Sequence, residues 1–230
     1  MLITRACMTV DDLNSQLRSA YESALQQLER YWHPEDGDSR PMLIAVHPGY
    51  SALRFKLMVV GQEAGGWAES IPMGAGATER LMEFYTNFEL GRRQRSTPFW
   101  QGARYLNARL NPDAPAEAFL WSNLVKVDVR RRRPPTDVEN ALASLHLLER
   151  EIEITAPTGV VFFTGPRYDD RLKATFPAAS IEDLGGGTAR VVGLGCAAVR
   201  TYHPRYLRLS NTFNKELDKA LVVLAEGGQM

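Results

Sequence analysis

Residues 57–67 read LMVVGQEAGGW, and this stretch decides the fold. The aliphatic run that starts at Leu57 is typical of a buried parallel strand, and it ends abruptly at Gly61. Glycine allows a sharp turn and a close approach of the backbone to a ligand. Glu63 is therefore expected just beyond the carboxyl end of a strand, where open α/β sheets bind their ligands. The alternative is a solvated Glu63 in an ordinary turn between a strand and a helix.

Three further apolar runs have the pattern of a strand that ends in a turn. Residues 119–127 read FLWSNLVKV, in which Asn123 interrupts the run although asparagine is a poor strand former. Its amide donates and accepts at once, which suits the reading of a base edge, whereas the alternative is that it caps a turn. Residues 159–165 read GVVFFTG. Residues 197–204 read AAVRTYHP, in which Pro204 favours an extended His203, a candidate for stabilising charge.

Helical patterns separate these strands. Apolar spacing predicts helices over residues 10–32, 78–87, 98–110 and 136–154, and residues 190–201 are expected to form a bend or hairpin. Strands that alternate with helices favour a parallel sheet covered on both faces. We therefore expect a single domain over residues 1–230, a three-layer α/β/α sandwich with a short central parallel sheet, although the length also permits two small domains. Residues 1–50 form the N-terminal helix and lead-in, and residues 55–210 form the core.

In this order the runs resemble the motifs of the uracil-DNA glycosylase superfamily, over roughly residues 55–210. Residues 61–65, GQEAG, are similar to its first motif, and residues 122–126, SNLVK, to its asparagine-bearing strand. Residues 203–207, HPRYL, are similar to its second motif, which begins His-Pro, and residues 159–165 to its third strand. The chain departs from the pattern at Ala64, where proline is usual, at Glu63, where aspartate is common, and at Arg205 and Tyr206, where small residues are common.

The resemblance implies an enzyme that releases a base from DNA. It assigns catalysis to Glu63, which would orient water and stabilise the positively charged sugar, and to His203, which would stabilise the departing base. It assigns base binding to Gly61, Gln62, Asn123 and Trp67, of which Trp67 would stack on the extruded base in competition with Phe84, Tyr85, Phe99 and Trp100. DNA binding falls to Lys126, Arg130, Arg131, Arg132, Arg133, Arg205, Tyr206 and Leu207, the last two standing where superfamily members insert a wedge into the duplex.

The arginine run at residues 130–133 precedes Pro134 and Pro135, and residues 92, 93 and 95 are also arginines. Guanidinium groups match phosphate geometry, so phosphate contact is one interpretation of the run. A solvated loop or a protein contact is the other.

Composition sets the outer limits on function. The chain has 27 basic and 27 acidic side chains, and a net charge of zero argues against a strongly electrostatic nucleic-acid binder. Two cysteines cannot supply the four thiolates of an iron–sulfur cluster, and four scattered histidines have no zinc spacing, so we expect no metal and no cofactor. The sequence has neither a signal-peptide pattern nor an apolar run of about 18 residues, and we expect a cytoplasmic monomer.

The leading hypothesis for function is a DNA glycosylase-like hydrolase that cleaves the N-glycosidic bond of uracil or a related altered base in DNA. The alternative is a nucleic-acid- or nucleotide-binding protein that kept the fold and lost hydrolysis. A third hypothesis is a hydrolase of free nucleosides.

Overall fold

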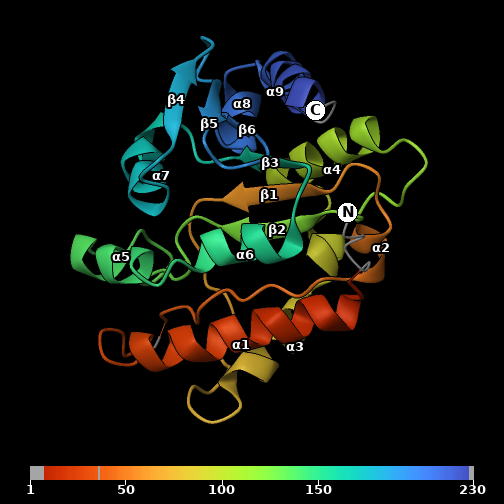
Figure 1. Ribbon diagram of the computed structural model, residues 1–230. Helices are drawn as coiled ribbons and strands as arrows, with labels where there is room; N and C mark the ends of the chain where they lie inside the picture. Colours follow the sequence, from red (N-terminus) through yellow and green to blue (C-terminus); the bar gives the residue numbers. More distant parts are fainter. Residues whose placement is uncertain (1–7, 36, 228–230) are drawn as a thin grey trace, which may run out of the picture.

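One mixed sheet of six strands organises the part of the chain that the structure, a computed structural model, describes: residues 8–35 and 37–227 (Figure 1). The strand order is β2-β1-β3-β6-β5-β4. The four parallel neighbours are β2 (Leu120–Asn123), β1 (Leu57–Gly61), β3 (Gly159–Phe162) and β6 (Ala197–Arg200). At one edge, β5 (Ala189–Val192) and β4 (Ser180–Asp183) run antiparallel. The protein is thus an α/β protein whose parallel core is extended at one edge by β5, which is antiparallel to β6, and by β4, which is antiparallel to β5 and was not predicted from the sequence.

Helices flank this sheet. They are α1 (Val10–Leu28), α2 (Pro48–Ser51), α3 (Ala77–Asn87), α4 (Pro98–Leu110), α5 (Thr136–Ala143), α6 (Leu147–Thr155), α7 (Asp169–Thr175), α8 (Pro204–Leu209) and α9 (Phe213–Gly227), with the 3-10 helices η1 (Glu89–Gln94) and η2 (Pro166–Tyr168). One group packs α1 against α3 and α6, while a second joins α4, α8 and α9, of which α9 lies on β3 and β6 (Figure 1). None of the described helices combines the length and the apolar character that a membrane span requires.

The helices expected over residues 78–87 and 98–110 are confirmed to within a residue. A capping box between Thr9 and Asp12 begins α1, which ends at Leu28, four residues short of the prediction. The single helix expected over residues 136–154 is wrong, because the chain turns at His146, whose φ is +51°. The turn lets α5 pack against α7 while α6 packs against α1. The hairpin expected over residues 190–201 is confirmed by the antiparallel pairing of β5 with β6.

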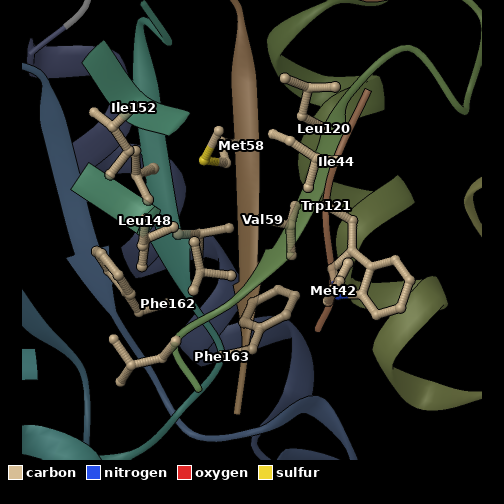
Figure 2. Packing of buried hydrophobic residues seen from close by; sticks show 14 of the residues in the cluster. Met42, Ile44, Met58, Val59, Leu120, Trp121, Leu148, Ile152, Phe162 and Phe163 are labelled. Atoms are coloured by element: carbon tan, nitrogen blue, oxygen red, sulfur yellow. The ribbon is translucent and has the colours of Figure 1, made fainter. Parts of the chain in front are cut away.

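Residues 42–46, which precede β1 in the chain, belong to the core although no strand or helix includes them. Met42 and Ile44 are fully buried and pack beside β2 (Figure 2). The Met42 amide donates to the Lys126 carbonyl at 2.9 Å, and the Asn14 side chain bonds both the N–H and the C=O of Val46. These bonds satisfy backbone groups that burial would otherwise leave unpaired.

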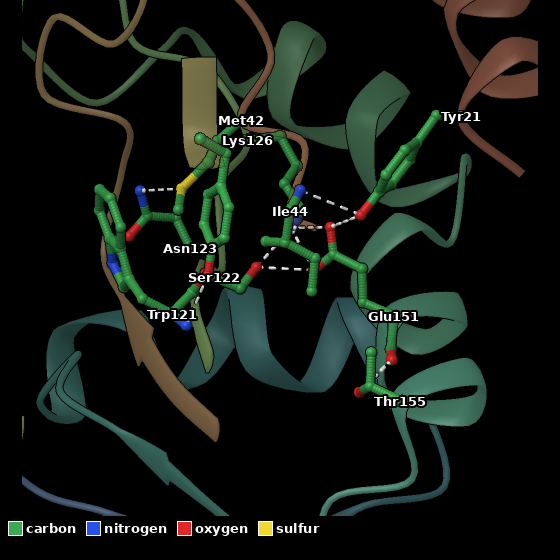
Figure 3. A network of polar contacts seen from close by, with 10 residues as sticks. Tyr21, Met42, Ile44, Trp121, Ser122, Asn123, Lys126, Glu151 and Thr155 are labelled. Carbon is green, nitrogen blue, oxygen red and sulfur yellow. Dashed lines mark hydrogen bonds and ion pairs between the residues drawn. The ribbon is translucent and has the colours of Figure 1, made fainter. Parts of the chain in front are cut away.

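A buried ionic network lies behind β2 (Figure 3). The Lys126 ammonium donates to both carboxylate oxygens of Glu151, at 2.7 and 2.6 Å, and to Ser122 Oγ. Tyr21 and Ser122 also donate to Glu151, at 2.9 and 2.6 Å. Burial lowers the pKa of Lys126, and the neighbouring Glu151 opposes that shift. The network joins α1, β2 and α6, the elements that support the strand of Asn123.

The Lys126→Met substitution should lower the free energy of unfolding by about 3–5 kcal/mol, because it leaves the Glu151 carboxylate buried without a counter-charge. The double variant Lys126→Met with Glu151→Leu should recover much of that loss, since no buried charge is then left unpaired. Urea denaturation of both variants measures the effect. A Lys126→Met protein as stable as the unmodified chain would show that the ion pair does not support the core.

Candidate functional site

The carboxyl ends of three strands meet at one cleft. Glu63 lies two residues beyond β1, Asn123 is the last residue of β2, and His203 lies three residues beyond β6. All three side chains line an open cleft of about 900 Å³, together with Gln62 and Arg205. The structure thus brings together residues that are 140 positions apart in the chain, at the edge of the sheet where α/β proteins bind ligands.

Gly61 makes room for Asn123. The two residues are paired across β1 and β2, and a Cβ added to Gly61 would collide with Asn123 Oδ1. Asn123 is only 2% exposed, and its Nδ2 donates to the thioether of Met42 at 3.1 Å. A thioether is a weak acceptor, so this bond costs little to exchange for a stronger one. A polar ligand in the cleft can therefore replace this weak bond to the amide.

Glu63 is half-buried, and its carboxylate accepts a hydrogen bond from the Tyr168 phenol. Burial raises the pKa of Glu63, and the bond from Tyr168 opposes the rise. Next to it, Gln62 donates from Nε2 to the Thr164 carbonyl at 2.9 Å, which ties the turn after β1 to the turn after β3. Glu63 thus combines a raised pKa with a fixed orientation, two properties expected of a general base.

His203 precedes α8 and caps it, since Nδ1 accepts from the Arg205 amide at 3.2 Å. An accepting Nδ1 leaves the proton of the neutral ring on Nε2. Burial, and then the charge of Arg205, lowers the pKa of His203 to about 4, so the ring is neutral at pH 7. His203 is therefore a neutral donor through Nε2 rather than a cation.

Asp128, a residue that the sequence analysis missed, holds two loops of the site. Its carboxylate is fully buried and accepts from the amides of Gly66 and Arg131, each at 2.6 Å. Gly66 has a φ of +79°, a conformation that favours glycine and turns its amide to this bond. Asp128 thereby holds both the turn that carries Glu63 and the loop of residues 130–133, which we call the arginine loop.

Phe99 is better placed than Trp67 to stack on a ligand. Trp67 is 5% exposed and makes edge contacts with Phe84, Phe88 and Trp121, so most of its ring surface is occupied by the core. Phe99, at the start of α4, is only partly buried and stacks on His203 with ring centroids 5.7 Å apart. Both rings line the cleft, so Trp67 stays a candidate for stacking, and Phe99, one of its expected competitors, presents more exposed surface to a ligand.

A glycine in α4 sets this position of Phe99. A Cβ at Gly102 would lie 2.9 Å from the Pro204 ring, so only glycine allows α4 to approach the start of α8 this closely. The contact brings Phe99 beside the His-Pro turn. The adjacent Trp100 is 3% exposed, in keeping with a role in the core.

Two residues expected to bind DNA are buried instead. Lys126 is 3% exposed and is ion-paired with Glu151, and Leu207 is 0% exposed on the buried face of α8. Neither has surface left for a phosphate or a base step, so both expectations are corrected. Tyr206, next to Leu207, is 51% exposed and packs at a tilt against the ring of Tyr202, with ring centroids 4.4 Å apart.

The arginine loop is divided between paired and unpaired side chains. Arg130 and Arg131 are exposed and make ion pairs of 3.4 Å with Glu35 and Glu69. Arg133 is half-buried, and its Nε lies 2.5 Å from Glu139, so its guanidinium is held by this ion pair. In the described part of the chain, Arg132 and Arg205 have no ion-pair partner.

No protein-family model matches the sequence, and no curated protein is significantly similar to it. Among residues 8–35 and 37–227, no group of three or more His, Cys, Asp and Glu side chains is arranged to hold a metal ion. The geometry of the cleft therefore carries the functional conclusion.

The Gly61→Ala substitution should displace the Asn123 amide, because the added methyl occupies the space of Oδ1. We expect loss of ligand binding in the cleft with a modest loss of stability, since both residues lie at the end of their strands. The Gly195→Ala variant is the control, because Gly195 lies outside the cleft and a Cβ there has nothing within 4 Å, although its φ of +75° adds some backbone strain. A crystal structure of Gly61→Ala with Asn123 unmoved would contradict the steric argument.

Proposed function

We propose that this protein is a DNA glycosylase-like hydrolase that cleaves the N-glycosidic bond of uracil or a related altered base in DNA. The observation that carries the proposal is the cleft itself, in which Glu63, Asn123 and His203 converge with Phe99 stacked on His203. The parallel strand order β2-β1-β3-β6 and the helices around it support a three-layer α/β/α domain like that of uracil-DNA glycosylases.

The residues in the cleft have the chemistry that this reaction requires. The bond between the sugar C1′ and the base nitrogen breaks, and its electron pair leaves with the base as an anion. The neutral His203 donates a hydrogen bond from Nε2 to a carbonyl oxygen of that anion. The Glu63 carboxylate stabilises the positive sugar and accepts a proton from the water that attacks C1′. Asn123 contacts the polar edge of the base, and Phe99 stacks on its face.

The surface beside the cleft supports contact with a nucleic acid. Arg205 lines the cleft and lacks an ion-pair partner in the described part of the chain, and the adjacent Tyr206 is exposed. Arg132, exposed on the loop of residues 130–133, is a second cation without an ion-pair partner among the described residues. Arginines position a DNA backbone, and an exposed aromatic side chain can contact base steps.

The binding alternative is favoured by a different observation. Arg130, Arg131 and Arg133 are already paired with acidic side chains, and the net charge is zero, so the electrostatic attraction to DNA is weak. Weak attraction to a DNA backbone fits a protein that binds a nucleotide without hydrolysing it. An assay for base release distinguishes the two functions.

Base release should be measured in single turnover on oligonucleotides that carry uracil, hypoxanthine, xanthine or hydroxymethyluracil. The Glu63→Gln and His203→Ala variants should each lose about 10²–10³ in rate, because one removes the general base and the other removes the donor to the leaving anion. The two losses should not add, since both groups act on one transition state. Asn123→Ala should instead alter the choice of base.

The matched control is Glu153→Gln, which alters an exposed carboxylate on α6 that is paired with Arg150. Full single-turnover rates in both Glu63→Gln and His203→Ala would refute the catalytic assignment. If the unmodified protein binds such DNA and releases no base from it, the binding alternative replaces the enzyme.

The double variant Arg130→Gln with Arg132→Gln should weaken DNA binding equally for all sequences and reduce the slope of log affinity against log salt by up to ~2. Arg133 is left intact because its guanidinium supports Glu139. A double variant of Arg18 and Arg150, exposed arginines on α1 and α6, is the control. An unchanged slope would assign the loop to solvent or to a protein contact.

A further inference from the structure

A second side chain reaches Glu63 from the turn after β3. Tyr168 ends η2, is 5% exposed, and donates its phenolic hydrogen to Glu63 Oε2. Gly165 precedes it with a φ of +71°, which allows the chain to turn sharply from β3 into η2. The turn from β3 into η2 therefore places the Tyr168 phenol beside the Glu63 carboxylate.

The ring of Tyr168 is itself held. The Arg133 guanidinium lies over it, 4.8 Å from the ring centroid. Glu139 fixes that guanidinium through bonds of 2.5 and 2.9 Å from Nε and Nη2. Glu139 is 3% exposed, and its carbonyl accepts from Arg171 at 2.6 Å. A cation over an aromatic face is attracted by the ring, so this chain of contacts restrains the phenol in one position.

Four ionisable groups act on Glu63 besides burial. Asp128, from the segment after β2, and Glu139, from α5, raise its pKa as burial does. Tyr168 and Arg133 lower the pKa, and the Tyr168 hydrogen bond is the larger of these two effects. The phenol is thus the main contact that favours the ionised form of Glu63.

We propose that Tyr168 is a positioning residue: its phenol, restrained by Arg133 and Glu139, orients the Glu63 carboxylate for its work in the cleft. This inference rests on the proposed function for the role of Glu63 in base release. The contact between the two side chains is independent of that function. Tyr168 lies outside the four motifs at the strand ends, so the motifs do not predict its role.

The experiment is a ¹³C NMR titration of the Glu63 carboxyl in the unmodified protein and in Tyr168→Phe, with single-turnover rates measured across the same pH range. Loss of the hydrogen bond should raise the pKa of Glu63 by about one unit or more, because the bond stabilises the charged form. If the carboxylate is the active form, the acid limb of the rate profile should move to higher pH by the same amount. The rate on the plateau should fall roughly 10–100-fold as orientation is lost.

Tyr105→Phe is the matched control, since it deletes a phenol that donates to the Asp218 carboxylate at 2.5 Å on an exposed surface. It should leave both the pKa of Glu63 and the rate unchanged. The reciprocal variant Glu63→Gln should lower the pKa of the Tyr168 phenol, which Glu63 raises, and it tests the same contact with Tyr168 in place.

The outcomes separate the two proposals. An unchanged pKa of Glu63 in Tyr168→Phe, or of Tyr168 in Glu63→Gln, overturns the positioning role whatever the activity. A shifted pKa together with a shifted acid limb supports it. A shifted pKa in a protein that releases none of the bases supports the contact and refutes the glycosylase.

Discussion

The parallel pairing of β2, β1, β3 and β6 is the constraint on which the site depends. Parallel strands all end at the same edge, so the turns that follow them meet there regardless of their distance in the chain. The register is equally important. Gly61, which has no side chain, is paired with Asn123 and so leaves room for its buried amide. A shift of one residue would set a bulky neighbour against Asn123 and turn the strand's other face to the cleft.

Two ionic clusters, one buried and one partly buried, support this edge. Lys126 and Glu151 bond to Ser122, the residue before Asn123, and so anchor the end of β2. Arg133 and Glu139 anchor Tyr168, and through it the end of the turn after β1. Buried ion pairs add little stability compared with apolar packing, but they tolerate few alternative geometries. In this protein the first cluster bonds to the neighbour of Asn123, and the second contacts Tyr168, which bonds to Glu63. Both clusters therefore restrain a side chain of the cleft.

The strand ends could be predicted from sequence because aliphatic runs that stop at Gly61, Asn123 or the His-Pro turn are local patterns. The helices α1, α3 and α4 were predictable for the same reason, whereas α2, α7, α8 and α9 were not predicted. Burial at the level of a single residue was not, since Lys126 and Leu207 occupy positions whose exposure depends on how α6 and α8 pack. Tyr168 contacts Glu63, 105 positions away, and Asp128 contacts Gly66, 62 positions away; no local pattern reveals such partners. A tyrosine that follows Gly165 and Pro166 beyond a strand was the one signal available for Tyr168.

Burial has opposite effects on the pKa of Glu63 and the pKa of His203, which both line the cleft. It raises the pKa of Glu63 and lowers the pKa of His203 to about 4, so each group is driven toward its neutral form. A cationic His203 would attract the Glu63 carboxylate and reduce its effect on any positive charge that forms in a ligand. A neutral His203 donates a hydrogen bond without competing for that carboxylate. With His203 neutral, the contacts from Tyr168 and Arg133 are what favour a charged Glu63, so the cleft can hold an anion at one place and a neutral donor at another.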